Sequence, residues 1–476
     1  MWRLWPTHPL SPGRYRPLCG GTSQTAVGGT DMSDSLTVLH LTAHLGGGIG
    51  KALNGLILNT PPDSGICHEI VCLEIPEKSQ FLEKLLDAGC PVIINPTPET
   101  LSERIRNADI VQLEWWGHPA IPAALCRGPL PPMRLLVWCH VSGLYTPVIP
   151  QKLMTAAHSC VFTSPCSLES VETSTLPLKA VKRLGVIYSC GGFDDLTAPV
   201  RSPCEPLRAG MIGSLNFAKL HPRFVEFLAA VSLRGFTVRL VGDMVNREML
   251  EEQSRRANRP DMLEFRGYVT DIARELSEIN VFPYILNPLH YGTTENALLE
   301  AMAMGVVPVV LDNLAEKCLV DDNITGLIVG NPRQFANAIE WLADNPAERA
   351  RLSMNAQTMV RRRFTASKMT DAFAVQYDAI KSTDKSVVRF GDIFGYAPSE
   401  WFLSIQRTPG YFTDALTDCA IDEFALPGML EKTKGSIFHY RNLFPADTRF
   451  SRWINRLDAL ALHSKGPQIQ QPPVLS

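Results

Sequence analysis

The chain has 476 residues, of which 45% are hydrophobic and 20% are charged, and its net charge is -3. At about 150 residues per domain, this length predicts three domains, or two large ones and a tail. The near balance of 45 basic and 48 acidic residues, without a block rich in Lys and Arg, excludes a strongly basic nucleic-acid-binding protein. No stretch approaches the roughly 18 uninterrupted apolar residues of a membrane-spanning helix. We therefore expect a cytoplasmic protein that is at most peripheral to a membrane.

The twelve cysteines show no pattern of a metal site or a disulfide framework. None form a C-x-x-C pair, and no Cys/His cluster has the spacing of a zinc site. A disulfide framework would be unusual in a chain of this length without a secretory signal. We therefore expect reduced thiols and no bound metal.

Residues 1–31 are rich in Pro, Gly, Arg and Thr, and they contain no acidic residue before Asp31. They lack the apolar core of a signal peptide. Their prolines also disfavour the amphipathic helix of a transit peptide. We predict that this segment is a disordered extension, with Met32 as an alternative start of the protein.

Residues 32–190 alternate short apolar runs with helical stretches such as Ser79–Ala88 and Leu101–Ala108. Near-continuous hydrophobic runs are typical of parallel strands that helices cover on both faces. The predicted strands are Leu36–Leu41, Glu69–Glu74, Val92–Asn95, Ile110–Leu113, Leu135–Cys139 and Cys160–Thr163. The alternation predicts an open, doubly wound parallel sheet.

Residues 191–207 are dense in Gly, Pro and Ser, which is typical of a linker, and the same pattern restarts over 208–382. The predicted strands there are Gly210–Leu215, Thr237–Val241, Leu263–Phe265, Val281–Ile285, Val306–Leu311 and Gly326–Val329. The predicted helices are Pro222–Leu233, Arg247–Ala257, Thr270–Ile279, Thr294–Met304, Pro332–Asp344, Pro346–Phe364 and Ser367–Ile380. The sequence thus predicts an α/β protein with two Rossmann-like parallel-sheet domains that face each other across a cleft.

Residues 383–476 do not continue the alternation of strands and helices. They are rich in Phe, Tyr, Trp and Pro, which is not the composition of a disordered segment. We predict an ordered C-terminal extension of unknown role, with a frayed end over 466–476.

A glycine-rich loop at 46–50 follows the first predicted strand and precedes a helix. Glycines at such a turn let backbone N–H groups approach an anion at the helix N-terminus. The loop is not a Walker A sequence, because Ala52 replaces Ser or Thr, and Leu53 breaks the G-x-G-x-x-G pattern. A P-loop ATPase and an NAD-dependent dehydrogenase are therefore disfavoured. We expect the loop to face a ligand; the alternative is a turn without one.

The stretch 291–311 predicts a helix that begins near Thr294, whose hydroxyl caps it, and ends at Gly305 before a strand. This helix is apolar nearly all round, so Glu300 is a single carboxylate among buried neighbours. An unpaired buried carboxylate is costly and would take up a proton. Glu300 therefore needs either an unseen Lys or Arg, or a polyol ligand such as a ribose whose phosphates lie at the N-terminus of the helix.

The sequence ALLEAMAMGVVPVVL at 297–311 resembles the second half of the pattern E-G-F-G-L-x-x-L-E-A-M-A-x-G-x-P-V-V. That pattern is found in the retaining glycosyltransferases of family 4, which have the GT-B fold. The resemblance implies that Glu300 binds the ribose of a nucleotide-sugar donor. The family's first glutamate, which contacts the transferred sugar, falls on Gly292. Glu295 or Asn296, at the same helix N-terminus, could take its place.

The segment 213–219 is similar to the G-R-L-x-x-x-K segment of the same family. Lys219 falls on the lysine that neutralises the diphosphate, whereas Ser214 replaces the arginine. His140 ends a predicted strand, and the resemblance implies that it lies near the transferred sugar; the alternative is a core histidine. We predict that His140 and Lys219 are catalytic. The predicted donor-binding residues are Gly46, Gly47, Gly48, Lys219, Thr293, Thr294, Glu295, Asn296 and Glu300.

The segment Gln112–His118 places two tryptophans beside polar side chains at the end of another predicted strand. Sugar C–H faces stack on aromatic rings, so this combination suits a carbohydrate. The alternative is tryptophan packing in the core. The predicted acceptor-side residues are Glu114, Trp115, Trp116 and His118.

The resemblance implies a glycosyltransferase of the hexosyltransferase type that retains the anomeric configuration and needs no metal. Its donor would be a nucleotide-sugar, which is a substrate and not a cofactor. Its acceptor would be a hydroxyl of a glycan or a lipid-linked molecule in polysaccharide or glycolipid biosynthesis. Two alternatives stay open, the first of them because the family's first glutamate and the arginine are missing. One is a non-catalytic relative that binds sugar-nucleotides or glycans, and the other is a sugar-nucleotide epimerase of the same fold.

Overall fold

The structure is a computed structural model that describes residues 35–190, 193, 196–202, 205–412 and 421–464. The extension predicted over 1–31, parts of the predicted linker and the predicted frayed end lie outside the described residues. From Leu36 onward the chain belongs to one unit. The domain boundaries near 190, 208 and 382 stay predictions.

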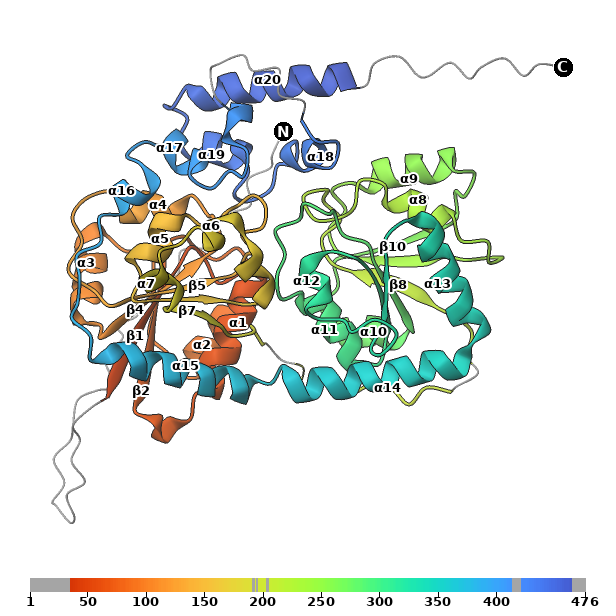
Figure 1. Ribbon diagram of the computed structural model, residues 1–476, viewed down its shortest axis with the longest axis horizontal. Coiled ribbons are helices and arrows are strands. Elements are labelled where there is room, and N and C mark those ends of the chain that lie inside the picture. The colour runs from red at the N-terminus through yellow and green to blue at the C-terminus, as the bar shows by residue number, and fades with distance from the viewer. Residues whose placement is uncertain (1–34, 191–192, 194–195, 203–204, 413–420, 465–476) are drawn as a thin grey trace, which may run out of the picture. The chain divides into compact units, whose positions relative to one another are not determined.

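The described residues form thirteen strands in two sheets (Figure 1). The strands of the first sheet are β1 (Leu36–Thr42), β2 (Ile66–Cys72), β3 (Val92–Ile94), β4 (Ile110–Trp115), β5 (Leu135–Cys139), β6 (Ser159–Phe162) and β7 (Leu184–Val186). Those of the second are β8 (Ala209–Ile212), β9 (Val238–Val241), β10 (Leu263–Gly267), β11 (Val281–Tyr284), β12 (Val307–Leu311) and β13 (Leu327–Val329). The prediction of two parallel-sheet domains is confirmed.

Strand order places the candidate site. The first sheet runs β3-β2-β1-β4-β5-β6-β7 and the second runs β10-β9-β8-β11-β12-β13, with every pair parallel. The order therefore reverses between β1 and β4 in the first sheet, and between β8 and β11 in the second. Ligands of open parallel sheets bind outside the carboxyl ends of the strands at such reversals.

All twelve predicted strands are present, with boundaries within three residues of the prediction. Strand β7 was missed. It has only three residues, all half-buried at the edge of the sheet, so it lacks the continuous apolar run of an inner strand.

The helices that cover the sheets follow the predicted alternation. In the first half they are α1 (Gly47–Asn59), α2 (Gln80–Asp87), α3 (Pro98–Asn107), α4 (Ala120–Leu125), α5 (Gln151–Ala156), α6 (Val171–Ser174) and α7 (Leu178–Val181). In the second half they are α8 (Phe224–Ala229), α9 (Arg247–Arg256), α10 (Ile272–Ser277), α11 (Asn296–Ala303), α12 (Leu314–Lys317) and α13 (Pro332–Asp344).

Two long helices, α14 (Pro346–Arg363) and α15 (Ala366–Lys381), carry the chain from the second sheet back to the first (Figure 1). Helix α14 packs on α11, and its Ser353 hydroxyl donates to the carbonyl oxygen of Gly305 at 2.7 Å. Helix α15 packs on α1, and its Tyr377 hydroxyl donates to Oε1 of Gln112 on β4 at 2.7 Å. The last helix before the extension therefore completes the core of the first half.

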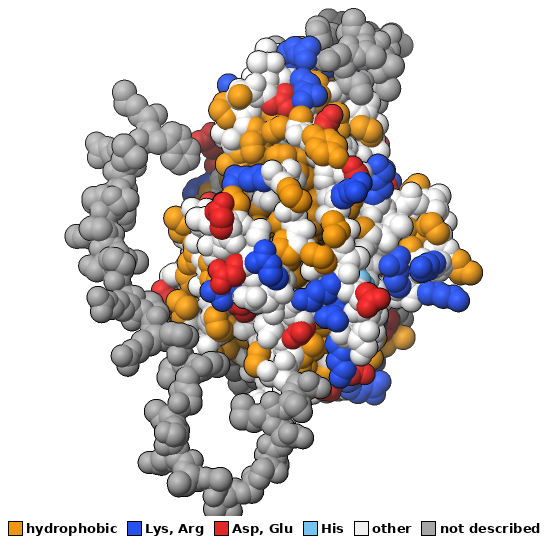
Figure 2. Space-filling view, turned by 90° about the vertical axis from the view of Figure 1, so that its left-hand side faces the viewer, with side chains coloured by type: hydrophobic (Ala, Val, Ile, Leu, Met, Phe, Trp, Pro, Cys, Tyr) orange, Lys and Arg blue, Asp and Glu red, His pale blue; other side chains and the backbone are white. Residues whose placement is uncertain are grey.

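The extension is ordered over its described residues, as predicted. Its helices are α16 (Phe390–Phe394), α17 (Pro398–Leu403), α18 (Ala425–Met429), α19 (Ile437–Leu443) and α20 (Arg449–Ser464). Its aromatic rings join the core of the first sheet: Phe394 stacks on Trp115 with ring centroids 5.1 Å apart, and Phe402 packs against Tyr440 and Trp453. Figure 2 shows hydrophobic side chains gathered over the upper part of one face, where the extension lies.

No helix of the described residues is long and apolar enough to cross a membrane. None of the nine described cysteines forms a disulfide with another described residue, and five of them are buried.

Candidate functional site

A cavity of about 780 Å³ lies at the carboxyl ends of both sheets. This volume is in the range of small-molecule sites. The first half contributes the loop after β1 and the residues that directly follow β4 and β5, Trp116 and His140. The second half contributes Lys219 from the loop after β8 and the segment 292–297 at the start of α11. Residues of the extension and further residues of both halves line the rest.

The glycine loop forms part of the wall of this cavity, and Gly46, Gly47 and Gly48 all line it. Gly47 has φ of +57°, a conformation that a side chain disfavours, so the loop needs glycine there. A side chain at Gly48 would come within 3.4 Å of Nδ2 of Asn296. The loop after β1 and the start of α11 therefore lie on adjoining parts of the cavity wall.

Three residues of the cavity wall carry a buried polar atom without a hydrogen-bond partner among the described residues. The atoms are Nε2 of His44, Nε1 of Trp116 and Oδ1 of Asn296. Nδ1 of His44 accepts the N–H of Gly46 at 2.9 Å, so the neutral ring carries its hydrogen on Nε2. Because buried polar groups are normally paired, two unused donors and one unused acceptor favour a polar ligand.

Lys219 forms an ion pair with Glu295 at the wall of the cavity. The Lys219 Nζ to Glu295 Oε2 distance is 2.7 Å, and the side chains are 22% and 3% exposed. Burial by itself lowers the pKa of Lys219, but the negative charge of Glu295 has the larger effect, so the net result is a raised pKa. Burial by itself raises the pKa of Glu295, but the charges of Lys219 and His290 have the larger effect, so the net result is a lowered pKa. Both groups are therefore charged at neutral pH.

The Glu295 carboxylate occupies the space that a side chain at position 292 would need. A Cβ built on Gly292 would lie 1.8 Å from Oε1 of Glu295 and 2.7 Å from Nδ1 of His290. The hydroxyl of Tyr284 donates to Oε2 of Glu295 and holds the carboxylate there. The Glu295 carboxylate can therefore occupy this position only because residue 292 is a glycine.

Glu300 pairs with Lys51 of α1, and the two side chains are 15% and 22% exposed. The expected burial of Glu300 is therefore only partial. Of the two sequence-based alternatives for Glu300, an ion pair is present in the structure, and a ribose contact stays a prediction. Neither side chain is among the described residues that line the cavity. Lys51 thus brings a cation from the first half to α11 of the second half. Ser214, which stands at the position of the family's arginine, brings none, and its hydroxyl donates to Oδ2 of Asp243 at 2.7 Å.

The predicted cap of α11 was wrong. The helix begins at Asn296, after Glu295, and it has no side-chain cap. The Thr294 hydroxyl donates instead to the carbonyl oxygen of Thr163, which follows β6. Thr293 and Thr163 are also joined through their hydroxyls at 3.1 Å. The threonines thus tie the start of α11 to the first half, and they still line the cavity.

His140 lines the cavity, and its ring is hydrogen-bonded to the buried carboxylate of Glu114. Nε2 of His140 lies 2.8 Å from Oε2 of Glu114. Burial raises the pKa of Glu114, but hydrogen bonds from His140 and His40 outweigh it and the pKa is lowered. An ionised carboxylate only accepts, so His140 donates from Nε2 and its Nδ1 has no partner among the described residues. Neutral His140 therefore has a free acceptor atom.

The other predicted acceptor-side residues are placed differently. Glu114, Trp115 and His118 are 0%, 1% and 0% exposed and do not line the cavity among the described residues, whereas Trp116 does. Glu114 thus lies behind His140, and Trp115 stacks on the extension in the core. Direct contact with an acceptor stays a prediction for Trp116 alone.

One group of potential metal ligands occurs among the described residues: Glu74, His118 and His439. Nδ1 of His118 accepts the N–H of Ala120 at 3.2 Å, and Nδ1 of His439 accepts the N–H of Gly435 at 3.0 Å. The neutral rings therefore carry hydrogen on Nε2 and offer no lone pair there, whereas metal-bound histidines normally donate from their second nitrogen. We assign no metal to this group.

Sequence reasoning did not find Tyr284 or the wall that the extension contributes. Tyr284 ends β11 eleven residues before Glu295, so the buried-strand pattern hid its polar role. The wall residues of the extension follow no motif. Their composition indicated order, but it contained no signal for where they pack.

The fold is that of the GT-B glycosyltransferases, with two Rossmann-like domains of parallel sheet. HepE of Anabaena in complex with UDP is similar with a TM-score of 0.58 and 16% identity, over 72% of this chain and 100% of that chain. A glycosyltransferase from Rickettsia africae is similar with a TM-score of 0.57 and 16% identity, over 74% and 100%. Sucrose-phosphate synthase from Thermosynechococcus elongatus has a TM-score of 0.53 and 16% identity, over 72% and 98%.

Residues 206–345, which contain β8 to β13 and the start of α11, match the family model of glycosyl transferases group 1. None of the curated proteins matches this chain in sequence. Because HepE is covered completely by 72% of this chain, about a quarter of the chain has no counterpart in that structure.

Proposed function

We propose that the protein is a glycosyltransferase that moves a sugar, with retention, from a nucleotide-sugar to a hydroxyl of a glycan or lipid-linked acceptor. The observation that carries the proposal is the ion pair of half-buried Lys219 with buried Glu295 at the start of α11, in the same cavity as the glycine loop. The match of residues 206–345 to group 1 glycosyl transferases supports it, as do the complexes of HepE with UDP and UDP-glucose.

The donor would bind with its diphosphate between Lys219 and the glycine loop. The amide groups at the N-terminus of α1 attract negative charge, and the Lys219 ammonium adds a full positive charge. Glu295 would accept hydroxyls of the transferred sugar in place of the family's first glutamate, because its carboxylate fills the space beside Gly292. Glu300 would bind the ribose.

In the proposed reaction, the bond between the anomeric carbon and the diphosphate oxygen breaks, and its electron pair leaves with the diphosphate. The acceptor oxygen bonds to the anomeric carbon on the same face, and its proton passes to the departing diphosphate. Lys219 stabilises the charge that develops on the leaving group. His140 accepts a hydroxyl of the transferred sugar at Nδ1, since Glu114 holds its Nε2–H. In this proposal the chain's own residues position the substrates, and no step is assigned to a metal.

Thermal denaturation against UDP, GDP, ADP, CMP, NAD and the corresponding nucleotide-sugars tests the donor site. A ligand at a hundredfold excess over its dissociation constant stabilises the native state by about 2.7 kcal/mol, so a selective rise of the midpoint is expected with one nucleoside diphosphate. Donor turnover with an acceptor, with NMR of the product's anomeric proton, then tests transfer and retention. A folded protein whose midpoint none of these nucleotides moves would contradict the proposal.

A second candidate is a non-catalytic sugar-nucleotide-binding protein. The observation that favours it is Ser214, whose hydroxyl is bonded to Asp243 and which supplies no cation for the diphosphate. Nucleotide binding without any donor consumption, including slow hydrolysis, would select this candidate. Conversion of the donor to another sugar-nucleotide without an acceptor would instead indicate an epimerase.

A further inference from the structure

The extension forms one wall of the cavity, and this wall differs in chemistry from the wall around Lys219. Its hydrophobic lining residues include Phe402, Ile405, Tyr411, Phe424, Met429 and Ile437. Phe402, Ile405 and Ile437 are about 2% exposed and join the core, whereas Tyr411, Phe424 and Met429 are half-buried. We call these half-buried three residues of the extension the apolar wall.

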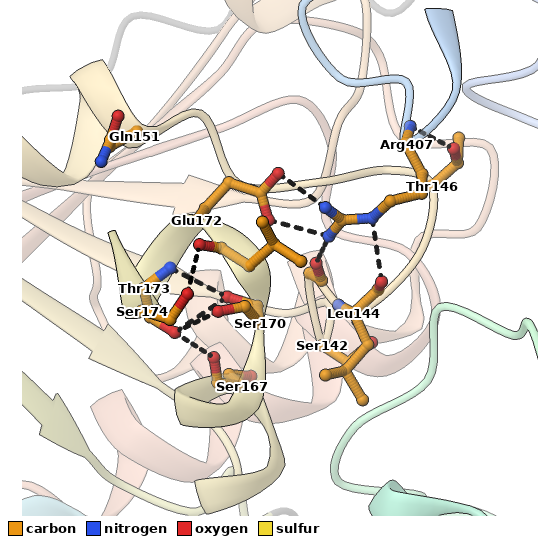
Figure 3. Close-up of polar contacts among 12 residues, drawn as sticks. Ser142, Leu144, Thr146, Gln151, Ser167, Ser170, Glu172, Thr173, Ser174 and Arg407 are labelled. Carbon is orange, nitrogen blue, oxygen red and sulfur yellow. Dashed lines mark hydrogen bonds and ion pairs between the residues drawn. The ribbon is translucent and has the colours of Figure 1, made fainter. Parts of the chain in front are cut away.

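The extension is anchored to the first half through Arg407 (Figure 3). Its guanidinium donates to both carboxylate oxygens of Glu172 at 2.8 Å, and to the carbonyl oxygens of Gly143 and Leu144 at 2.7 and 3.1 Å. Its backbone N–H donates to the hydroxyl of Thr146 at 2.9 Å. A bidentate pair with two further bonds holds this part of the extension in one geometry.

The extension is also anchored to the second half. The carboxylate of Glu431 accepts the N–H of Phe217 at 2.8 Å and the amide of Asn246 at 2.6 Å. Nδ2 of Asn287 donates to the carbonyl oxygen of Phe424 at 2.8 Å. Helix α18 comes so close to the loop after β8 that a side chain at Gly428 would lie 3.1 Å from Cα of Ala218. Contacts to both halves make the apolar wall a fixed part of the cavity.

Each charged or amide side chain that the extension brings to the cavity makes at least one contact within the protein. Arg407 is paired with Glu172, and the Lys434 ammonium lies 3.1 Å from Oε1 of Glu77. The Gln406 amide donates to the carbonyl oxygen of Phe402 at 3.1 Å, and Oδ1 of Asp422 accepts the N–H of Phe424 at 2.7 Å. A sugar chain needs many free donors and acceptors, whereas half-buried aromatic and thioether groups gain from contact with apolar surface.

We propose that the apolar wall is an acceptor subsite for an apolar body, an alkyl chain or an aromatic ring, attached to the sugar or alcohol that carries the reacting hydroxyl. The assignment of this body to an acceptor rests on the proposed glycosyltransferase function. The subsite lies in the same cavity as Lys219 and His140, so one molecule reaches from the apolar wall to the reacting end. The C-terminal extension then sets acceptor specificity.

Calorimetric titration of the full chain with three glucosides tests the proposal: octyl, phenyl and methyl β-D-glucoside, with the octyl compound kept below its micelle concentration. Because the three compounds share the glucose head group, any difference in their affinities is due to the octyl, phenyl or methyl group. We expect the octyl or the phenyl compound to bind at least about tenfold more tightly than the methyl compound. Preference for octyl indicates a lipid chain, and preference for phenyl an aromatic group. Equal affinity for all three, or no saturable binding, overturns the proposal.

Two variants locate the binding. Met429→Glu places a charge in the apolar wall and is expected to abolish the preference for an apolar body. Met354→Glu, at a position that is 65% exposed, is the matched control and should keep it. If Met429→Glu does not fold, Phe424→Ala should lower octyl glucoside affinity about fivefold. Retained preference in the folded wall variants overturns the proposal.

Nucleotide binding separates this inference from the proposed function. The wild type and Met429→Glu should show the same midpoint shift with the nucleoside diphosphate. If the nucleotide binds but no glucoside is preferred, the subsite is wrong and the glycosyltransferase proposal stands. If no nucleotide binds but the octyl or phenyl preference depends on Met429, the subsite stands and the glycosyltransferase proposal fails.

Discussion

The two walls of the cavity differ in how far apart their residues lie in the chain. The wall of the second half is built from two short segments, 213–219 and 284–297. The opposite wall combines the loop after β1, single residues after β4 and β5, and helices of the extension. The first kind of wall leaves a local pattern in the sequence, whereas the second exists only once the chain has folded. If the two walls also have different functions, variants of the wall of the second half should change nucleotide binding. Variants of the opposite wall should change turnover.

The largest expected effect is that of Lys219→Met. It removes the cation of the donor wall and leaves the Glu295 carboxylate, which is 3% exposed, without its partner. Affinity for the nucleoside diphosphate should fall about a hundredfold, and breaking the pair should destabilise the fold by about 3–5 kcal/mol. Calorimetry and urea unfolding measure the two effects. The double variant with Glu295→Gln should regain stability but not affinity; unchanged affinity in folded Lys219→Met would remove Lys219 from the donor site.

His140→Ala tests the opposite wall. Turnover should fall about a hundredfold, because the group proposed to accept a sugar hydroxyl is lost, while nucleotide affinity stays within about threefold. Glu114→Gln keeps the shape of the side chain but removes the charge that accepts the Nε2–H of His140, so it should lower kcat more than it changes KM. Full turnover in His140→Ala would end its proposed role.

Gly292→Ala tests whether Glu295 has taken over the space of the residue at 292. The added methyl would lie 1.8 Å from Oε1 of Glu295, so the carboxylate must move away from Tyr284 and Lys219. We expect about a tenfold loss of donor affinity. Gly128→Ala, which meets nothing within 4 Å, is the matched control and should change nothing. Equal behaviour of the two alanine variants would contradict the link between 292 and 295.

Glu300→Ala and Lys51→Met separate the two interpretations of Glu300. If Glu300 binds the ribose, its loss should weaken nucleotide binding about tenfold, and loss of Lys51 should weaken it less than about threefold. If the ion pair is only structural, both variants should lower the thermal midpoint alike and leave nucleotide affinity unchanged. Isothermal titration with the nucleoside diphosphate decides between the two outcomes.

The smallest expected effect is a pH dependence of stability at the cavity. Burial, with Lys434 and His439, lowers the pKa of His44 from 6.5 to about 4, although Glu77 opposes the shift. Between these values the unfolded chain takes up a proton that the folded protein does not, so this contribution to stability is lost as pH falls from 6.5 towards 4. Urea unfolding at pH 7 and pH 4.5 should show a smaller loss in His44→Gln than in the wild type. An identical loss in both proteins would contradict the assignment.

The regular part of the fold was predictable because its signals are local. Buried parallel strands require continuous apolar runs, so β5 was predicted at its observed limits, whereas the three half-buried residues of β7 left no such run. The glycine loop between β1 and α1 was predicted for a similar reason, because its backbone conformation depends on the residues of the turn itself.

The partners of the charged and polar side chains were not predictable in the same way. Glu114 was predicted as an acceptor-side residue, but it lies fully buried beside His140 because neighbouring strands bring their ends together. Thr294 was expected to cap α11, but the first half offers it the carbonyl oxygen of Thr163. A polar side chain bonds to what lies within about 3 Å, and that neighbour is set by packing.

The sequence by itself determined the two wound sheets, the glycine loop and the segment that resembles a donor-binding helix, since strand and turn formation depend on residues close together in the chain. Only the tertiary structure decided that Lys51 pairs with Glu300, 249 residues away, that the Glu295 carboxylate fills the space beside Gly292, and that the extension lines the cavity. Such contacts form between surfaces that meet when separate elements pack. Their energy depends on distance and burial, which no local pattern contains.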